Sequence, residues 1–221
     1  MKKLALLLFC VLVGLGSAWG GVTGTTNPAL FNDYVDWCVQ YGCTGGQLPS
    51  PQSWTSQSGI TGEVGLVGTL QGFYNLQQGV SWFGGFPAGM GLVYNGAFFG
   101  NTPTQIATTF DMGILGAGAW IQDNYLSDTY TASIELFDSS YQSLGVYSVA
   151  VAPGTAIFIG AFGSSPVWAA QFDIVDQYGY EDFAIGELRL STVPEPSSLL
   201  LMGSSVLGLA GVLRRRFKGV L

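Results

Sequence analysis

The chain has 221 residues, of which 48% are hydrophobic and 10% are charged, and its 7 Lys and Arg against 14 Asp and Glu give a formal net charge of −7. It contains no His, which excludes Ser-His-Asp and Cys-His catalysis and His metal ligands. The shortage of Lys and Arg argues against nucleic-acid binding, and the apolar and aromatic content argues against a disordered chain.

The charges are distributed very unevenly along the sequence. Residues 21–193 contain thirteen acidic residues and a single base, Arg189, for a net charge of −12. The remaining cations lie close to the two ends: Lys2, Lys3, Arg214, Arg215, Arg216 and Lys218. An acidic body between two basic, apolar ends predicts an exported domain with a targeting segment on each side.

Residues 1–20 have the pattern of a secretory signal peptide. Lys2 and Lys3 precede an apolar run over residues 4–15, which is too short to cross a bilayer. Small residues follow, and cleavage after Ala18 satisfies the small-x-small rule, with cleavage after Gly20 as the alternative. An uncleaved anchor or a buried helix is the other interpretation of this segment.

A short helical segment and a cysteine pair follow. Residues 29–40 are compatible with a short helix that Asn27-Pro28 would open. Cys38 and Cys43 are the only cysteines beyond the signal peptide, and outside the cytoplasm this spacing predicts a local disulfide. A two-Cys metal site is the rival hypothesis, but it lacks further His or Cys ligands.

Four strands are expected before residue 125. Residues 64–70 and 91–94 are plausible strands among many glycines, and residues 106–110 and 115–121 predict two more. No helix of ordinary length is expected in the body.

The second half of the body has the clearest strand signals. In residues 130–136, Tyr130, Ala132, Ile134 and Leu136 alternate with polar residues, which is the period of a half-buried strand. A turn at 138–140 and a returning strand at 144–150 should follow.

Further strands are predicted to the end of the body. Residues 156–162 should form a central strand, with a turn at 163–166. Trp168, Ala170, Phe172 and Ile174 alternate again, which places Trp168 in the core. Residues 183–190 predict the last strand, with Leu188 and Leu190 on its core face. Turn signals every 8–12 residues or so predict an all-β, antiparallel β-sandwich or jelly-roll-like ectodomain over residues 21–192.

Arg189 should find a carboxylate partner because the body offers so many. Glu187, two residues earlier on the same strand face, is the nearest candidate. Because the opposite face carries the core residues, we expect an exposed pair.

The acidic residues form two groups in the sequence. One contains Asp111, Asp123 and Asp128, and the other contains Asp173, Asp176, Glu181 and Asp182. A solvated acidic surface is the simpler interpretation. Oxygen ligands in loops at the edge of a sandwich also suit Ca²⁺, for which Asp176, Glu181 and Asp182 are the candidate ligands; no other cofactor is expected.

Aromatic residues and paired carboxylates suggest two glycan-directed alternatives. Five tryptophans, Trp37, Trp54, Trp82, Trp120 and Trp168, would supply a sugar-stacking platform, with Trp54 as the best exposed candidate. Two carboxylates would suffice for glycoside hydrolysis, but the sequence singles out no such pair. We therefore expect no enzymatic activity and assign no catalytic residue.

The segment 193–218 contains three features in order. Pro194-Glu195-Pro196 lies in a rigid polar segment, residues 197–213 are apolar and near the lower length limit of a transmembrane helix, and Arg214, Arg215 and Arg216 form a basic tail. Positive residues stay cytoplasmic, so the acidic body would lie outside. An amphipathic core helix is the alternative, but the run lacks a polar face.

This ordered tail resembles the PEP-CTERM sorting signal of Gram-negative-type bacteria. The resemblance implies recognition and cleavage by an exosortase, a membrane-embedded transpeptidase-like enzyme. It also implies a transient stay in the inner membrane through the C-terminal helix, followed by transfer to the cell surface or extracellular matrix. The two prolines fit a processing tag because they keep the junction extended and accessible.

The body resembles a recurring type of PEP-CTERM ectodomain. The similarity rests on four motifs: Asp36-Trp37, residues 82–87 (WFGGFP), residues 116–122 (GAGAWIQ) and residues 182–188 (DFAIGEL). Such proteins usually have Asp after the Ile of the last motif, where this chain has Gly186 followed by Glu187. Any role of that Asp therefore does not transfer directly.

Together these features predict an exported, surface-sorted β-sandwich with a structural or interaction role and an exosortase as its processing partner. A secreted carbohydrate-binding module that contacts extracellular polysaccharide is the alternative, and a glycan-active enzyme is a third hypothesis.

Overall fold

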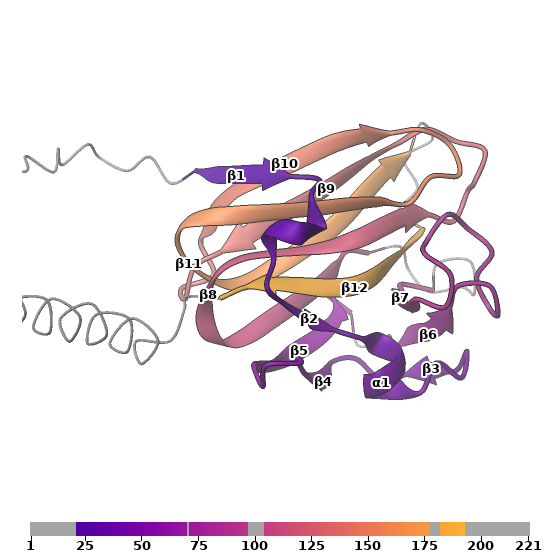
Figure 1. Ribbon diagram of the computed structural model, residues 1–221, viewed down its shortest axis with the longest axis horizontal. Coiled ribbons are helices and arrows are strands. Elements are labelled where there is room, and N and C mark those ends of the chain that lie inside the picture. The colour runs from indigo at the N-terminus through magenta and orange to yellow at the C-terminus, as the bar shows by residue number, and fades with distance from the viewer. Residues whose placement is uncertain (1–20, 70, 97–103, 177–181, 193–221) are drawn as a thin grey trace, which may run out of the picture.

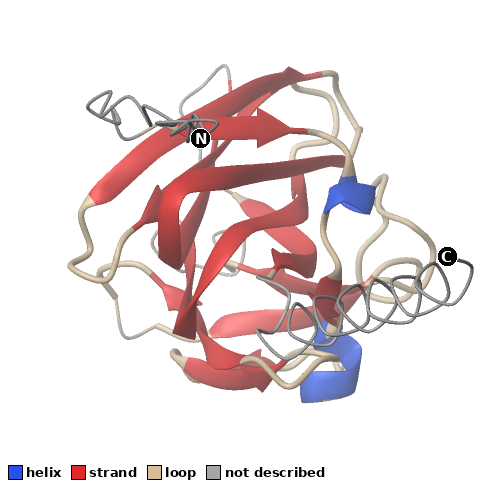
Figure 2. Cartoon of the chain, turned by 60° about the vertical axis from the view of Figure 1, so that its left-hand side comes forward, coloured by secondary structure: helices blue, strands red, loops and turns tan. Residues whose placement is uncertain are grey.

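The structure is a computed structural model that describes residues 21–69, 71–96, 104–176 and 182–192. The predicted signal peptide, with its cleavage after Ala18, and the predicted tail, with its helix over 197–213, lie outside these residues. The described chain is almost entirely antiparallel β-sheet, with two short helical segments at one side (Figure 2).

The strands, in chain order, are β1 (Val22–Thr25), β2 (Asp33–Val35), β3 (Gln47–Leu48), β4 (Gln52–Thr55), β5 (Thr61–Leu66), β6 (Phe73–Gln77), β7 (Gly91–Tyr94), β8 (Ile106–Asp123), β9 (Tyr130–Phe137), β10 (Ser143–Val151), β11 (Ile157–Asp176) and β12 (Phe183–Ser191). A 3₁₀ helix spans Pro28–Leu30, and α1 spans Trp37–Tyr41. The main path of the sheet runs β10-β9-β11-β8-β12-β7-β6-β3 (Figure 1).

Two long strands carry the sheet from one layer to the other. The first half of β8 pairs with β5 and its second half pairs with β12, while β11 pairs first with β1 and later with β9. The β8–β11 register breaks between Phe162 and Val167. A register break bends strands and lets them change sheets.

The two strands predicted at 106–110 and 115–121 are therefore one strand, β8. The turn predicted at 163–166 is wrong, because this stretch is the bend within β11 and not its end.

The resulting architecture is a β-sandwich, which confirms the predicted fold class. One layer contains β10, β9, the second half of β11, the first half of β8, β5 and β4. The other contains β1, the first half of β11, the second half of β8, β12, β2, β7, β6 and β3. One apolar core between the layers includes Ile106, Ile134 and Phe172 from the first layer and Ile121, Ile185 and Leu188 from the second.

The clearest sequence signals are confirmed. In β9, Tyr130, Ala132, Ile134 and Leu136 are buried and alternate with more exposed residues. The turn at 138–140 is fixed by the Asp138 carboxylate, whose Oδ1 accepts the backbone N–H groups of Ser140 and Gln142. Strands β7, β10 and β12 also lie where they were expected.

The N-terminal half departs more from expectation. The helix predicted over 29–40 is interrupted, because Asp33–Val35 pairs with β12 as a strand. Asn27 caps the 3₁₀ helix before this strand, and Asp36 caps α1 after it. The strand predicted at 64–70 is shifted, since β5 begins at Thr61 and ends at Leu66.

A second apolar cluster lies on the outer face of the second layer. Residues 78–90, here called the cover segment, place Trp82 and Phe86 against Leu92 and Tyr94 of β7. Both aromatic side chains of the cover segment are 5% exposed. This face of the sheet is thus protected from solvent by a loop and not by a helix.

Candidate functional site

Four sequence motifs that are far apart in the chain meet around the second layer. Asp36-Trp37 opens α1, residues 82–87 belong to the cover segment, residues 116–122 lie in β8, and residues 182–188 form most of β12. A hydrogen bond joins Asp36-Trp37 to residues 182–188, and others join residues 82–87 to residues 116–122. The resemblance seen in the sequence therefore corresponds to one connected region of the fold.

Trp37 anchors α1 to β12. Its side chain is fully buried, and its indole Nε1 donates to the backbone carbonyl of Gly186 at 2.6 Å. Buried indole N–H groups need such an acceptor. Gly186 is also tightly packed, because an added Cβ would collide with the Met90 sulfur and would lie 3.1 Å from the Trp120 side chain. A side chain at position 186 would therefore require the Met90 side chain to move and would crowd Trp120.

Gln122 of β8 holds the cover segment through hydrogen bonds. Its side-chain Oε1 accepts the Trp82 indole N–H at 3.3 Å and the Gly85 backbone N–H at 2.8 Å. Gln78 adds a bond from its amide nitrogen to the Gly84 carbonyl at 2.7 Å. Hydrogen bonds on both sides of Phe83 hold the tip of the segment in place, although the Phe83 ring itself is 77% exposed.

A hollow of about 220 Å³ opens where these segments meet. Its lining consists of Asp36, residues 87–91 and Glu187. The Oδ1 of Asp36 accepts the Cys38 and Val39 backbone N–H groups, which caps α1. Burial raises the pKa of Glu187, Arg189 opposes this shift, and the negative charge of Asp36 adds to it. The hollow therefore offers carboxylate acceptors beside exposed backbone, a lining suited to hydroxyl or cationic groups.

Arg189 forms the predicted pair with Glu187. The Arg189 guanidinium lies 2.6 Å from Glu187 Oε1 and 5.5 Å from the centre of the Tyr34 ring. The expectation of an exposed pair is wrong, because the two side chains are 30% and 19% exposed. Strand β2, which pairs with β12, brings Tyr34 alongside Arg189 and removes part of the pair from solvent.

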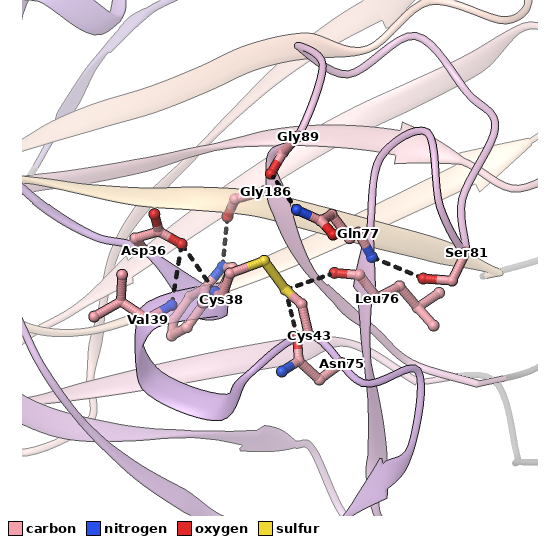
Figure 3. Close-up of a disulfide and its surroundings, with 11 residues drawn as sticks. Asp36, Cys38, Val39, Cys43, Asn75, Leu76, Gln77, Ser81, Gly89 and Gly186 are labelled. Carbon is pink, nitrogen blue, oxygen red and sulfur yellow. Dashed lines mark hydrogen bonds between the residues drawn. A yellow bond between two sulfur atoms is a disulfide. The ribbon is translucent and has the colours of Figure 1, made fainter.

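The structure contains the predicted disulfide between Cys38 and Cys43 (Figure 3). It closes α1 onto the turn that follows it, where Gly42 has a positive φ of 81°. The Cys43 sulfur lies 3.1 Å from the Leu76 carbonyl oxygen of β6. A Cβ at Gly91 would lie 2.5 Å from the Cys38 backbone nitrogen, so β7 also packs closely against the bridge. The bridge thus fastens the N-terminal segment to the second layer.

The tryptophans proposed for the alternative of a sugar-stacking platform are buried or half-buried. Trp54, the candidate predicted to be exposed, is 2% exposed and donates from Nε1 to the Thr108 hydroxyl at 3.0 Å. Trp37 and Trp82 are also buried. Trp168 is only half-buried and does not enter the core, because the register shift in β11 moves Val167 and Ala169 inward instead.

The acidic residues regroup in space. Asp111 accepts from the Thr61 hydroxyl, and Asp173 accepts from the Gln105 side-chain amide. Asp176 and Asp182 are 6% and 3% exposed, while Glu181 lies outside the described residues. Within the described ranges, no group of three or more His, Cys, Asp or Glu side chains could hold a metal ion.

Asp123 joins Asp176 and Asp182 at one end of the sandwich. Burial raises the pKa of Asp123 to about 7, against the lowering effect of a hydrogen bond from the Tyr125 backbone. The negative charges of Asp176, Asp182 and Asp128 raise it further. The sequence grouped Asp123 with Asp111 and Asp128 and quoted Gln122 as the last residue of a motif. It did not predict the contacts of either residue, because these come from segments that are distant in sequence.

The sorting residues themselves, Pro194, Glu195 and Pro196 with Arg214, Arg215 and Arg216, lie outside the described residues. Among the residues that the structure does describe, no helix is long and apolar enough to cross a membrane.

Comparisons with known proteins identify the tail. The family model of the PEP-CTERM protein-sorting motif matches residues 192–216. None of the curated proteins compared matches the chain. Among solved structures, a DUF4465 family protein from Bacteroides caccae is similar with a TM-score of 0.44 and 10% identity, over 72% of this chain and 100% of that one. The chain therefore carries the PEP-CTERM sorting motif of an exported, surface-sorted exosortase substrate.

Proposed function

We propose that this protein is a structural or interaction component of the cell surface or extracellular matrix, and not an enzyme. In this proposal the β-sandwich is the mature module and the tail is a removable tag. The observation that carries the proposal is the position of the boundary: β12 ends at Ser191, and the matched sorting motif begins at residue 192.

The last described residue is fastened to the body. The Thr192 backbone N–H donates to Asn32 Oδ1 at 3.0 Å, and Asn32 Nδ2 donates to the Thr192 hydroxyl at 3.1 Å. Cleavage after this point would leave every described strand and the core intact. The Pro194-Glu195-Pro196 segment, whose prolines favour an extended backbone, would then begin just beyond a fixed point, where an exosortase could reach it.

Membrane anchoring is part of the proposal and precedes processing. The apolar residues 197–213 would hold the exported protein in the inner membrane, and Arg214, Arg215 and Arg216 would remain cytoplasmic. An exosortase would then release the body to the surface.

The sorting step is tested by the mass of the surface protein from an exosortase-positive host. We expect the wild-type surface form to lack residues 199–221, and a variant with Ala at positions 194–196 to stay membrane-bound. Pro153→Ala, in a turn of the body, is the control and should be processed normally. A surface protein that retains residues 199–221 would contradict the proposal.

Extracellular polysaccharide is the partner that we propose for the body. The supporting observation is Phe83, whose ring is 77% exposed while the neighbouring Trp82 and Phe86 side chains are buried. Gln122 and Gln78 hold this loop tip in place. A rigid exposed ring loses little conformational entropy on binding, and aromatic rings provide large contact areas for partly apolar ligands.

Affinity electrophoresis with polysaccharide extracted from the producing bacterium tests this partner. We expect Phe83→Ala to weaken retardation at least about fivefold, the loss of roughly 1 kcal/mol that binding hot spots exceed. Val80→Ala is the matched control, because Val80 is 66% exposed on the same cover segment. Equal retardation of wild type and Phe83→Ala would contradict a role of the Phe83 ring in polysaccharide binding.

A further inference from the structure

The first and last strands of the body meet the same end of the sandwich. In β12, Ser191 lies opposite Gly116 of β8. In β1, Val22 lies opposite Gly163 of β11. Both glycines adjoin the bends at which β8 and β11 pass from one layer to the other (Figure 1). The predicted signal peptide and the sorting tail are therefore both joined to this end of the body.

Large apolar side chains are exposed at these two bends. In β8, Met112 is 49% exposed and Leu115 is 40% exposed. In β11, Pro166 is exposed and Trp168 is half-buried. The bends lie side by side, because a Cβ at Gly113 would lie 2.8 Å from the Pro166 Cβ and 3.3 Å from the Trp168 indole nitrogen. Exposed apolar residues that gather in one place indicate a contact surface, whereas single ones do not.

The turn between β9 and β10 adds an exposed tyrosine to this end. Phe137, the last residue of β9, lies opposite Ala169 of β11, so the turn that follows is close to the β11 bend. Tyr141 in this turn is 67% exposed and has a positive φ of 56°. A positive φ is uncommon and unfavourable for a residue with a large side chain. A turn that keeps a tyrosine in this conformation favours a role for the side chain.

The predicted membrane segment begins very close to this end. Only residues 193–196 separate Thr192 from Ser197, where the apolar run of the tail starts. An extended chain covers at most about 3.6 Å per residue, so these two residues lie within about 18 Å of each other. Asp123 lies at the other end, because β8 continues from Gly116 to Asp123, a distance of about 23 Å at the usual rise of a strand. While the tail is in the membrane, the bends are thus the part of the body nearest to the bilayer.

We propose that this apolar end docks on the lipid surface of the inner membrane while the tail anchors the chain. The apolar end consists of Met112, Leu115, Tyr141, Pro166 and Trp168. The proposal rests on the membrane anchoring proposed above. The aliphatic side chains would enter the headgroup region, and the tyrosine and tryptophan would lie at the level that aromatic residues prefer. Docking would hold Pro194-Glu195-Pro196 at the membrane surface, where a membrane-embedded exosortase could reach it.

Apolar contact, and not charge, would drive this docking. Asp111 and Asp138 lie at the same end, where Asp111 accepts from the Thr61 hydroxyl and Asp138 accepts the backbone N–H groups of its own turn. Arg189 is the one Lys or Arg between residues 21 and 193, and it pairs with Glu187. The body therefore offers no basic patch for anionic headgroups.

The docked state would depend on the tail. A few exposed side chains bury little apolar area, whereas a short tether keeps them at a high effective concentration beside the bilayer. Removal of the tail by an exosortase would end this advantage. Cleavage would thus release the body from the lipid surface as well as from its anchor.

Spin labels on the exported chain, with its tail intact, test the docking. Met112→Cys and Val80→Cys are each labelled with a nitroxide, and the chain is reconstituted into phosphatidylcholine vesicles that contain no exosortase. Val80 is the matched control because it is exposed on the cover segment, away from the bends. We expect the label at position 112 to be shielded from a water-soluble nickel chelate and accessible to oxygen dissolved in the lipid. The label at position 80 should show the reverse.

A second substitution separates docking from mere proximity to the membrane. Leu115→Asp, added to the chain labelled at position 112, should expose the label to the nickel chelate, because a carboxylate resists transfer into lipid. Val146→Asp is the control: Val146 is also exposed, but it lies within β10 and outside the bends. This variant should leave the label shielded. Equal shielding in both variants would overturn the proposal.

Flotation of the vesicles distinguishes a failure of docking from a failure of anchoring. A chain that does not float with the vesicles would contradict the membrane anchoring and, with it, the docking. A chain that floats, with labels at positions 112 and 80 equally accessible to the nickel chelate, would overturn the docking alone. Shielding that disappears when the chain is diluted in lipid would indicate contact between copies of the chain, and would also overturn it.

Discussion

Asp33 and Asp123 are carboxylates with nearly the same burial, but their surroundings differ completely. Asp33 Oδ1 accepts the backbone N–H groups of Tyr34 and Ser58, and its Oδ2 accepts the Ser58 hydroxyl at 2.5 Å. Asp123 receives only the Tyr125 backbone N–H and lies among the negative charges of other acids. Burial alone thus does not determine whether a charged group supports the fold.

The difference separates an acid whose two oxygens both have donors from an acid with an unpartnered oxygen. Asp33 links β2 to the turn before β5 through donors that cannot leave without unfolding that turn. Asp123 Oδ2 is buried and has no hydrogen-bond partner among the described residues. Unsatisfied buried polar groups cost stability, so a site that retains them is a candidate for function.

The largest effect should come from a buried carboxylate that has no partner at all. Ile134 is fully buried in β9 between apolar neighbours. Ile134→Asp should therefore destabilise the body by more than about 4 kcal/mol or prevent folding, as a solitary buried charge does. Urea unfolding or the yield of folded protein measures this loss.

Glu135→Gln is its neighbouring control, since Glu135 lies on the other face of β9. It should stay within about 0.5 kcal/mol of wild type. Equal losses for the two variants would mean that the assignment of the two faces is wrong.

The next effect is a pH dependence that Asp123 imposes on the stability of the body. Its pKa is about 7 in the folded chain against an ordinary value of 3.8, so its stabilising contribution is complete below about pH 4 and is lost as the pH rises to 7. At about 1.4 kcal/mol per pKa unit, this amounts to at most about 4 kcal/mol.

Urea unfolding at pH 4.5 and pH 8 measures this dependence. The free energy of unfolding of wild type, relative to that of Asp123→Asn, should be higher at pH 4.5 than at pH 8. At pH 8 the variant should be the more stable of the two. The raised pKa values of Asp173 and Glu187 act in the same direction in both proteins. Parallel pH profiles of wild type and variant would contradict the assignment to Asp123.

Removing the well-partnered acid should have an intermediate cost. Asp33→Ala leaves the Ser58 and Tyr34 N–H groups without their acceptor, and we expect a loss of about 2–3 kcal/mol at neutral pH. Ser58→Ala, which removes only the hydroxyl bond to Asp33, should lose about 1 kcal/mol. Chemical denaturation of the two variants checks the order, and a larger loss for Ser58→Ala would show that Asp33 does not organise this turn.

The smallest effect should come from the half-buried ion pair. Arg189→Gln breaks the contact with Glu187 and the stacking on Tyr34, and we expect a loss of about 1 kcal/mol. Thermal unfolding at low salt and in 0.5 M NaCl measures it, and salt should reduce the difference only partly because the pair is shielded. A loss of several kcal/mol that salt leaves unchanged would indicate a desolvated network instead.

The sequence predicted features that depend on near neighbours. The alternation in residues 130–136, the turn at Asp138 and the spacing of Cys38 and Cys43 follow from side-chain period, turn chemistry and chain reach, and the structure contains all three. The sorting motif at 192–216 was also recognisable, because an exosortase must read it as a linear signal.

Tertiary structure alone decided the bends, the burial and the site. Residues 163–166 have a turn composition, yet β1, β8 and β9 pair with β11 on either side of them and keep the strand continuous. Trp54 stands in a polar stretch, yet its indole finds Thr108 of β8 and becomes buried. Asp123 and Asp182 meet only because β8 and β12 pair. Each of these outcomes depends on strands distant in sequence, and local propensity contains no information about which strand will pair with which.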